Sequence, residues 1–381
     1  MMKIQSVTLR RLLTPMREPF QTSFGTEEDK DVVIVELRTA NGGVGFGECV
    51  ASTAPLYSEE TNDTAWHVME RFLIPKLFEL DIQSAADLRS VSIAFAPIKR
   101  NNMAKAALEM AVWDAWANEQ QTPLPELLGG ERREIPVGIS VGIQPTIPDL
   151  LRKIEGYLEQ GFQRIKVKVK PGWDVDVLRA IRQAFGDIPL MADANSAYRL
   201  DDADHLRKFD EFGLMMVEQP LAHDDIIDHA ALQRRLVTPI CLDESIHSAA
   251  DARKAMELGA CKIINLKLGR VGGFAEALQI HELCRRQGID LWCGGMLETG
   301  IGRLHNIAIT SLPGFTLPGD TAPSARYFEQ DIIHPPVTFS APGTLAVEPL
   351  CGVADRVRRE RLDAWTVKVQ TYEASREGVG G

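Results

Sequence analysis

The period of the hydrophobic pattern changes along the chain and divides it into two parts. In residues 1–130, short alternating runs typical of strands come first, and longer runs with helical periodicity follow. The polar, Gly-containing segment Glu18–Lys30 predicts a mobile loop between the first two strands. The predicted strands are Ile4–Leu12, Asp31–Arg38 and Val44–Cys49, and the predicted helices are Asp63–Leu77 and Met103–Glu119. The first part therefore has an α+β pattern.

Beyond residue 130, short β-branched runs alternate regularly with helical stretches, which predicts parallel βα units. Eight strand candidates favour a closed barrel over an open sheet. The predicted strands are Ile135–Ile143, Arg164–Val169, Pro189–Ala194, Leu214–Glu218, Ile240–Glu244, Lys262–Lys267, Ile289–Cys293 and Phe315–Gly319. Helices between them include Ile147–Gln160, Val175–Phe185, Asp202–Phe212, Ala249–Leu258 and Phe274–Gln287. Strand-like residues return in the tail, over Val337–Val369.

Composition narrows the class of protein. The 381 residues are 45% apolar and carry a net charge of −11, so we expect a globular protein that binds neither nucleic acid nor anionic membranes. The sequence has no apolar stretch long enough to span a bilayer and no signal-peptide pattern at its start. Six cysteines without a Cys-x-x-Cys pair are expected to be reduced, buried thiols of a cytoplasmic protein.

Five charged residues recur in phase with the predicted strands. Lys168, Asp193, Glu218, Asp243 and Lys267 follow one another at spacings of 25, 25, 25 and 24 residues, each at the C-terminal end of a strand. One βα unit takes about that many residues, so the five side chains are expected at one mouth of the barrel, where catalytic groups of this fold lie. Surface acids paired with exposed lysines are the alternative.

The three acids in the middle of this series predict a metal site. Three carboxylates that converge in a low-dielectric cavity require a cation or protonation. Oxygen-only ligands suit Mg²⁺, with Mn²⁺ as the alternative ion, better than Zn²⁺. Asp193, Glu218 and Asp243 are therefore the predicted ligands.

The lysines on both sides of the acids predict acid–base chemistry. In the alternating segment Arg164–Lys170, Lys166 and Lys168 should point into the barrel, where burial and mutual repulsion would lower their pKa values. Lys168 is then the predicted base, and Lys267 approaches from the other side of the substrate. Arg270 would lower the pKa of Lys267, bind an anionic substrate group, or form a salt bridge to a neighbouring loop.

These motifs resemble the enolase superfamily, in particular its muconate-lactonizing branch and the o-succinylbenzoate synthase / N-succinylamino acid racemase group. The matching motifs are Lys166-Val167-Lys168, Asp193-Ala194-Asn195, Glu218-Gln219-Pro220, Asp243-Glu244-Ser245 and Asn265-Leu266-Lys267. Longer matches are Pro19–Gly25, Pro171–Asp174, Trp292–Glu298 and Leu317–Asp320. Asp320-Thr321-Ala322 keeps only the first Asp of the Asp-x-Asp with which dipeptide epimerases hold a free ammonium. An N-acylated or amine-free carboxylate substrate is therefore expected.

The resemblance implies an α/β fold: a modified TIM barrel, (β/α)7β, over residues 131–324, with an α+β capping domain from residues 1–130 and 325–381. It implies Mg²⁺ on the three acids, Lys168 and Lys267 as the acid–base pair, and a homo-oligomer. It also implies a pocket and its supporting residues, with a loop that closes over them. The pocket residues are Ser140, Asn195, Gly294, Met296 and Leu297, the supporting residues are Lys166, Glu244 and Arg270, and the loop residues are Phe20 and Phe24.

Two reactions share such a site: dehydration to o-succinylbenzoate, a menaquinone precursor, and racemisation of N-succinylamino acids. Both begin by removing a proton α to a carboxylate, which leaves an enediolate. The alternatives are another muconate-cycloisomerase-like lyase or epimerase, a metal-free Schiff-base aldolase with Lys267 as nucleophile, and a non-catalytic binding protein.

Overall fold

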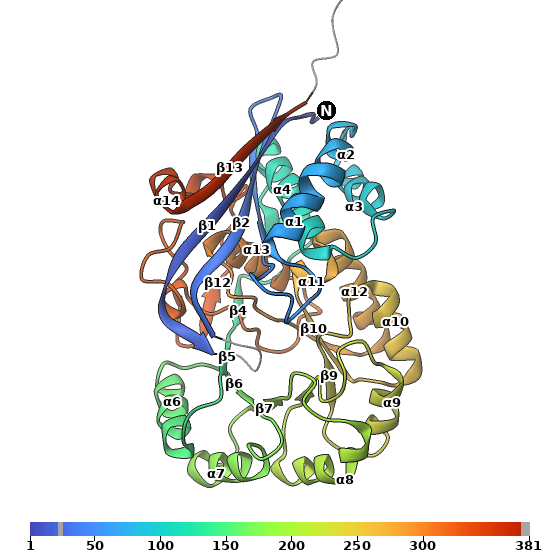
Figure 1. The fold of residues 1–381 in the computed structure, drawn as a ribbon, viewed down its shortest axis with the longest axis vertical. Helices are drawn as coiled ribbons and strands as arrows, with labels where there is room; N and C mark the ends of the chain where they lie inside the picture. Colours follow the sequence, from blue (N-terminus) through green and yellow to red (C-terminus); the bar gives the residue numbers. More distant parts are fainter. Residues whose placement is uncertain (22–25, 375–381) are drawn as a thin grey trace, which may run out of the picture.

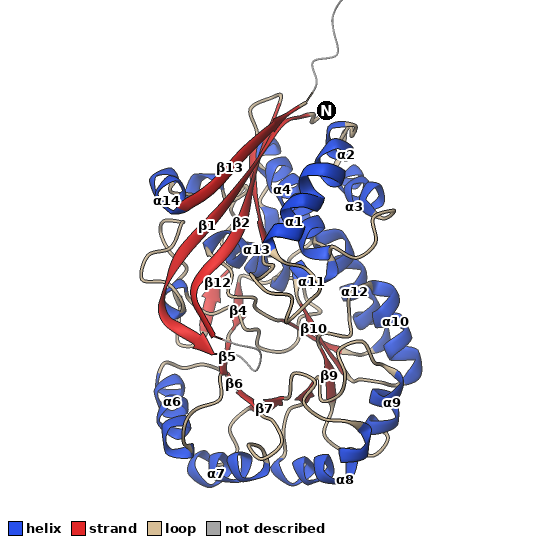
Figure 2. Cartoon of the chain, in the orientation of Figure 1, coloured by secondary structure: helices blue, strands red, loops and turns tan. Residues whose placement is uncertain are grey.

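The computed structural model describes residues 1–21 and 26–374. A tilted antiparallel sheet and its helices form a cap above a ring of strands and helices, and the first and last described strands both belong to the cap (Figure 1). In the described part of the chain, no helix is both long and apolar enough to cross a membrane. The α/β class predicted from the two hydrophobic periods is confirmed (Figure 2).

The ring is built on a curled parallel sheet, which has seven strands among the described residues, in the order β11-β10-β9-β8-β7-β6-β5. Its strands are β5 (Gly138–Val141), β6 (Arg164–Lys168), β7 (Leu190–Asp193), β8 (Val217–Glu218), β9 (Ile240–Leu242), β10 (Ile263–Leu266) and β11 (Asp290–Cys293). The predicted eighth strand, Phe315–Gly319, joins the two edges through parallel bridges from Leu291 to Phe315 and from Val137 to Gly319. This segment closes the barrel without forming a full strand.

Helices cover the outside of this sheet. They are α6 (Ile147–Glu159), α7 (Val175–Phe185), α8 (Ala203–Leu206), α9 (Ile227–Gln233), α10 (Ala249–Leu258), α11 (Leu268–Val271), α12 (Phe274–Gln287) and α13 (Gly300–Thr310). Helices α7, α10 and α12 have the predicted bounds, because one apolar face of each packs on the sheet. Every residue of α13 is buried, including the polar residues Arg303, His305 and Asn306.

The cap sheet, four-stranded in the described part of the chain, has the order β13-β1-β2-β3. Its strands are β1 (Ile4–Gln21), β2 (Thr26–Thr39), β3 (Val44–Cys49) and β13 (Thr366–Glu373). Strands β1 and β2 are longer than predicted, because their antiparallel ladder continues: Leu13 pairs with Asp31, and Thr14 pairs with Lys30. The prediction of a loop over all of Glu18–Lys30 is therefore wrong. Phe24 and the side chain of Phe20 lie outside the described residues.

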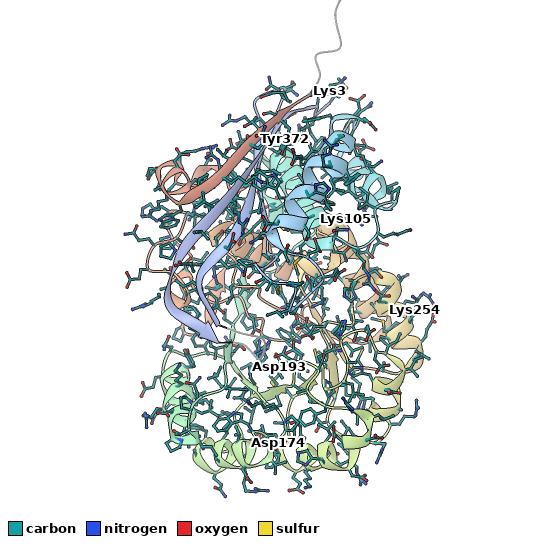
Figure 3. The ribbon with its side chains drawn as sticks, in the orientation of Figure 1. Lys3, Lys105, Asp174, Asp193, Lys254 and Tyr372 are labelled. Atoms are coloured by element: carbon teal, nitrogen blue, oxygen red, sulfur yellow. The ribbon has the colours of Figure 1, made fainter. Side chains whose placement is uncertain are left out.

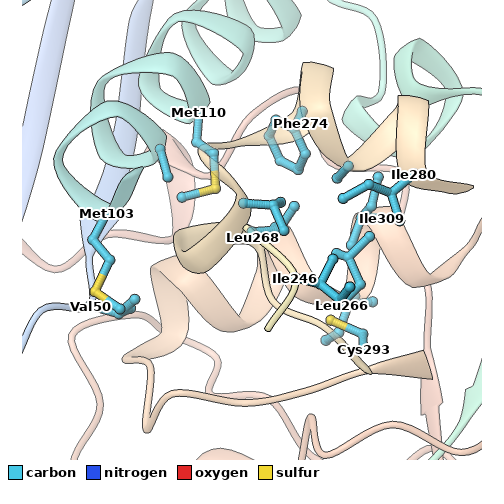
Figure 4. Packing of buried hydrophobic residues seen from close by; sticks show 14 of the residues in the cluster. Val50, Met103, Met110, Ile246, Leu266, Leu268, Phe274, Ile280, Cys293 and Ile309 are labelled. Atoms are coloured by element: carbon cyan, nitrogen blue, oxygen red, sulfur yellow. The ribbon is translucent and has the colours of Figure 1, made fainter. Parts of the chain in front are cut away.

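Helices pack against this sheet and connect it to the barrel. The cap helices are α1 (Asn62–Val68), a π-helical turn (Met69–Leu73), α2 (Ile74–Phe78), α3 (Ser90–Phe95), α4 (Asn102–Gln120) and α5 (Leu124–Leu128). Helix α4 lies very close to β3, since a Cβ on Gly47 would come within 1.9 Å of the Ala107 carbonyl oxygen. Near the N-terminal end of α4, the cap residues Val50 and Met103 lie near the barrel residue Leu268, and Met110 lies near Phe274 (Figure 4). One hydrophobic core therefore runs through both parts.

The C-terminal segment returns from the barrel to the cap. Strand β12 (Thr344–Ala346) pairs with β4 (Glu134–Pro136) below the cap, and α14 (Arg359–Trp365) leads into β13. Strand β13 pairs antiparallel with β1, so the first and last described strands lie side by side (Figure 1).

Candidate active site

The five charged residues that recur in the sequence lie at the ends of five neighbouring strands, as predicted. Lys168, Asp193 and Glu218 are the last residues of β6, β7 and β8, and they pair in register. Asp243 and Lys267 directly follow β9 and β10. All five therefore gather at the C-terminal mouth of the barrel, and Asp193 lies in the interior below the cap (Figure 3).

Lys168 lies beside Asp193 at this mouth. Its ammonium Nζ is 2.6 Å from Asp193 Oδ2 and 2.6 Å from Asn195 Oδ1. Asn195 has a positive φ of 42°, and its amide group donates to Glu244 Oε1 at 3.1 Å. The loop after β7 thus turns back into the mouth and connects Lys168 with Glu244.

Lys166 lies inside the barrel, as its alternation with apolar neighbours predicts. Its ammonium is surrounded by carboxylates, at 2.8 Å from Asp320, 3.1 Å from Glu218 and 3.3 Å from Asp193. Burial alone would lower the pKa of Lys166, but these carboxylates raise it well above its usual value. The predicted lowering of this pKa by a neighbouring cation is wrong in this arrangement, because the three carboxylates outweigh burial and the repulsion from Arg164.

Lys267 and Arg270 meet Asp243 on the opposite side of the mouth. Lys267 Nζ is 2.9 Å from Asp243 Oδ2, and the Arg270 guanidinium binds Asp243 Oδ1. Burial opposes the charge on Lys267, yet Asp243 raises its pKa far above the usual value, against the predicted lowering. Arg270 does lower the pKa of Lys267, as predicted, but Asp243 outweighs it. Arg270 also forms the salt bridge to Asp243 and donates a hydrogen bond to the Ile246 carbonyl oxygen at 2.7 Å.

Tyr57, on a cap loop, completes this cluster and was not predicted from the sequence. Its hydroxyl donates to Asp243 Oδ1 at 2.9 Å and accepts from Lys267 Nζ at 3.1 Å. The loop shows no periodic pattern, so only its position in the fold identifies it. A cavity of about 330 Å³ opens beside Tyr57 and is lined by Asn195, Glu244 and Arg270.

The three acids have the chemistry of a divalent-cation site. Asp193, Glu218 and Asp243 are at most 1% exposed, and burial near the other two carboxylates raises the pKa of Glu218 well above its usual range. Glu244 Oε2 is buried without a hydrogen-bond partner. Among the described residues these carboxylates do not form a preformed cluster of metal ligands, because each turns towards an ammonium, guanidinium or amide group. The donor set consists of oxygen atoms only, which fits Mg²⁺ or Mn²⁺.

The segment after β11 carries the other predicted pocket residues. A Cβ on Gly294 would lie 2.2 Å from Asn265 Oδ1 and 2.8 Å from Lys267 Cε, so glycine is needed for this close approach. Met296 and Leu297 are half-buried, and Leu297 has a positive φ of 58°. The remaining predicted residue, Ser140, lies on β5 next to Lys166 in the sheet register.

The buried carboxylate of the cap residue Glu48 holds the far end of this segment. Glu48 accepts hydrogen bonds from Thr299 N at 2.9 Å, Thr299 Oγ1 at 2.6 Å and Gly302 N at 2.9 Å. These donors belong to the first turn of α13, whose amide groups lack partners within the helix. The cap thus fixes one wall of the candidate site.

Comparisons with known proteins agree with this geometry. Residues 149–360 match the family model "Enolase C-terminal domain-like", and residues 4–129 match "Mandelate racemase / muconate lactonizing enzyme, N-terminal domain". The chain belongs to the enolase superfamily. A fold comparison with a superfamily member from Listeria innocua gives a TM-score of 0.94 at 39% identity, over 98% of this chain and all of the other.

Two characterised relatives define the group within this superfamily. An o-succinylbenzoate synthase from Geobacillus kaustophilus is 56% identical over 363 residues, which cover 95% of this chain and 96% of the relative. An N-succinylamino acid racemase from an Amycolatopsis species is 48% identical over 354 residues, 93% of this chain and 95% of that protein. The predicted group is therefore confirmed, and this member of the enolase superfamily is an enzyme.

Proposed function

We propose that this enzyme removes the proton α to the carboxylate of a succinyl-bearing substrate, with two outcomes. In one, a β-hydroxyl leaves and o-succinylbenzoate forms, which would serve menaquinone biosynthesis in the cytoplasm. In the other, the proton returns to either face of an N-succinylamino acid. The observation that carries the proposal is the barrel mouth, where Lys168 and Lys267 flank three buried acids at the ends of five neighbouring strands.

Each lysine has a role that follows from its side of the mouth. Lys168, beside Asp193, takes the α-proton, and the leaving β-hydroxyl receives a proton from the same side in the dehydration. Lys267, beside Asp243, stabilises the enediolate in that reaction and exchanges a proton with the opposite face in the racemisation. Asn195 and Tyr57 orient these two ammonium groups by hydrogen bonds. Two proton-exchanging groups on opposite faces are what racemisation requires.

Asp193, Glu218 and Asp243 would hold the divalent ion. Members of the superfamily use such an ion, typically Mg²⁺. Such an ion would supply positive charge that stabilises the enediolate. The Schiff-base alternative has less support, because it gives no role to the three buried acids that lie beside the lysines.

The test is an assay of both reactions on one purified preparation, with Mg²⁺ and with EDTA. We expect both activities, their loss in EDTA, and their return with excess Mg²⁺. Exchange of the α-proton into D₂O, followed by NMR on each N-succinylamino acid enantiomer, separates the two lysines. K168A should abolish exchange from one enantiomer and K267A from the other.

The matched control is K170A, which removes an exposed lysine two residues beyond Lys168 and should leave both rates unchanged. If K168A and K267A racemise at the wild-type rate, the two-base assignment is wrong. Activity that survives EDTA, together with a substrate adduct trapped by borohydride, would instead establish the aldolase. Activity that is absent under every condition would favour a binding protein.

A further inference from the structure

A second layer of charge lies inside the barrel, next to the three acids. Asp320, on the segment that closes the barrel, ion-pairs with Arg164 at 2.7 Å through Oδ1 and with Lys166 at 2.8 Å through Oδ2. The side chains of Arg164 and Lys166 are 1% and 4% exposed, and that of Asp320 is 9% exposed. One carboxylate therefore bridges two buried cations on the same strand, β6.

This bridge is built into the barrel. The face of Trp292 supports both cations, with the Arg164 guanidinium carbon 4.8 Å and the Lys166 Nζ 5.0 Å from the ring centroid. Gly138 leaves room for Arg164, since a Cβ there would come within 2.6 Å of the guanidinium. The backbone of Asp320 is fixed by a hydrogen bond from its N–H to the Cys293 carbonyl oxygen at 2.9 Å.

Lys166 is shared between this bridge and the candidate metal ligands. Its shortest ion pair is with Asp320, at 2.8 Å, whereas Glu218 and Asp193 are at 3.1 and 3.3 Å. Without the Asp320 charge, the ammonium would be held by Glu218 and Asp193 alone. It would then approach the two carboxylates that a divalent cation needs and compete with that cation for them.

We propose that Asp320 is a positioning residue that holds Lys166 back from Glu218 and Asp193 and so keeps these carboxylates open to the cation. The inference rests on the proposed function for its biological meaning, but metal binding alone tests it. Arg164 balances the charge of Asp320, which would otherwise draw Lys166 further from the acids.

The experiment is a titration of the protein with Mn²⁺, with the free ion followed by EPR, in a double-mutant cycle of D320N and K166M. We expect D320N to raise the Kd for Mn²⁺ about tenfold or more, which equals about 1.4 kcal/mol. If the effect runs through Lys166, D320N in the K166M background should change the Kd by less than about threefold. R164Q leaves Asp320 to Lys166 alone and should not weaken binding.

The matched control is D331N, which neutralises a buried carboxylate that accepts hydrogen bonds from Gly300 N and Ile332 N, and it should bind Mn²⁺ like the wild type. A D320N protein with wild-type affinity would overturn the proposal, as would an equal loss in the K166M background. If D320N does not fold, a tenfold loss of affinity in R164Q would overturn it instead. Wild-type protein that binds Mn²⁺ but catalyses neither reaction would overturn the proposed function alone.

Discussion

Glu109 offers a quantitative test of how the cap is attached to the barrel. This residue of α4 is fully buried, and its carboxylate accepts hydrogen bonds from Phe274 N at 2.8 Å and Ala275 N at 3.0 Å, in the first turn of the barrel helix α12. Burial raises its pKa to about 7, and the two backbone hydrogen bonds only partly oppose this rise. The folded protein therefore keeps a proton on Glu109 at a pH where the unfolded chain has released it.

The direction of the effect follows from this difference. Between the ordinary pKa of 4.5 and about 7, the folded state binds more protons than the unfolded state. The stability from Glu109 is thus fully present below pH 4.5 and is lost as the pH rises towards 7. For these two pKa values the linkage relation gives a loss of about 2–3 kcal/mol between pH 5 and pH 8.

The perturbation is E109Q, which stays neutral at every pH and keeps an acceptor oxygen. Urea unfolding followed by circular dichroism gives the free energy of unfolding of both proteins at pH 5, 6, 7 and 8. In the difference between the two free energies of unfolding, the contributions of other titrating groups cancel. We expect this difference to move by about 2–3 kcal/mol in favour of E109Q as the pH rises from 5 to 8. A difference constant within about 0.5 kcal/mol would refute the reasoning and indicate an ordinary pKa for Glu109.

Three further substitutions test the site walls. G294A should lower kcat about 100-fold, because the new Cβ would displace Lys267, and a nearly unchanged kcat would contradict this reading. Y57F removes the hydroxyl that touches Asp243 and should lower kcat/KM about fivefold, which steady-state kinetics measures against the wild type. E48L should lower the free energy of unfolding by about 1–3 kcal/mol, since buried donors of α13 lose their acceptor, and an unchanged urea midpoint would argue against it.

The parts of the fold that depend on periodicity were predictable from the sequence. Helices α7, α10 and α12 each have one apolar face, so their bounds follow from the pattern. The common spacing of Lys168, Asp193, Glu218, Asp243 and Lys267 reflects one βα unit per step, and the register of the parallel sheet brings them together. The extra length of β1 and β2 was not predictable in this way, because polar residues there are held by cross-strand hydrogen bonds rather than by an apolar face.

The charge state of the lysines shows why the rest required the structure. From the strand alone, the nearest charges to Lys166 are the cations Arg164 and Lys168, and repulsion predicts a lowered pKa. In the barrel, however, Lys166 meets Asp320, which lies 154 positions further along the chain, at 2.8 Å, and its pKa rises. Electrostatic effects depend on distance through space, so the sequence identified which residues could carry charge at the mouth but not which partners balance it. The proposed Mn²⁺ titration addresses that balance directly, because a divalent ion must displace the Lys166 ammonium, which Asp320 also holds from the segment that closes the barrel.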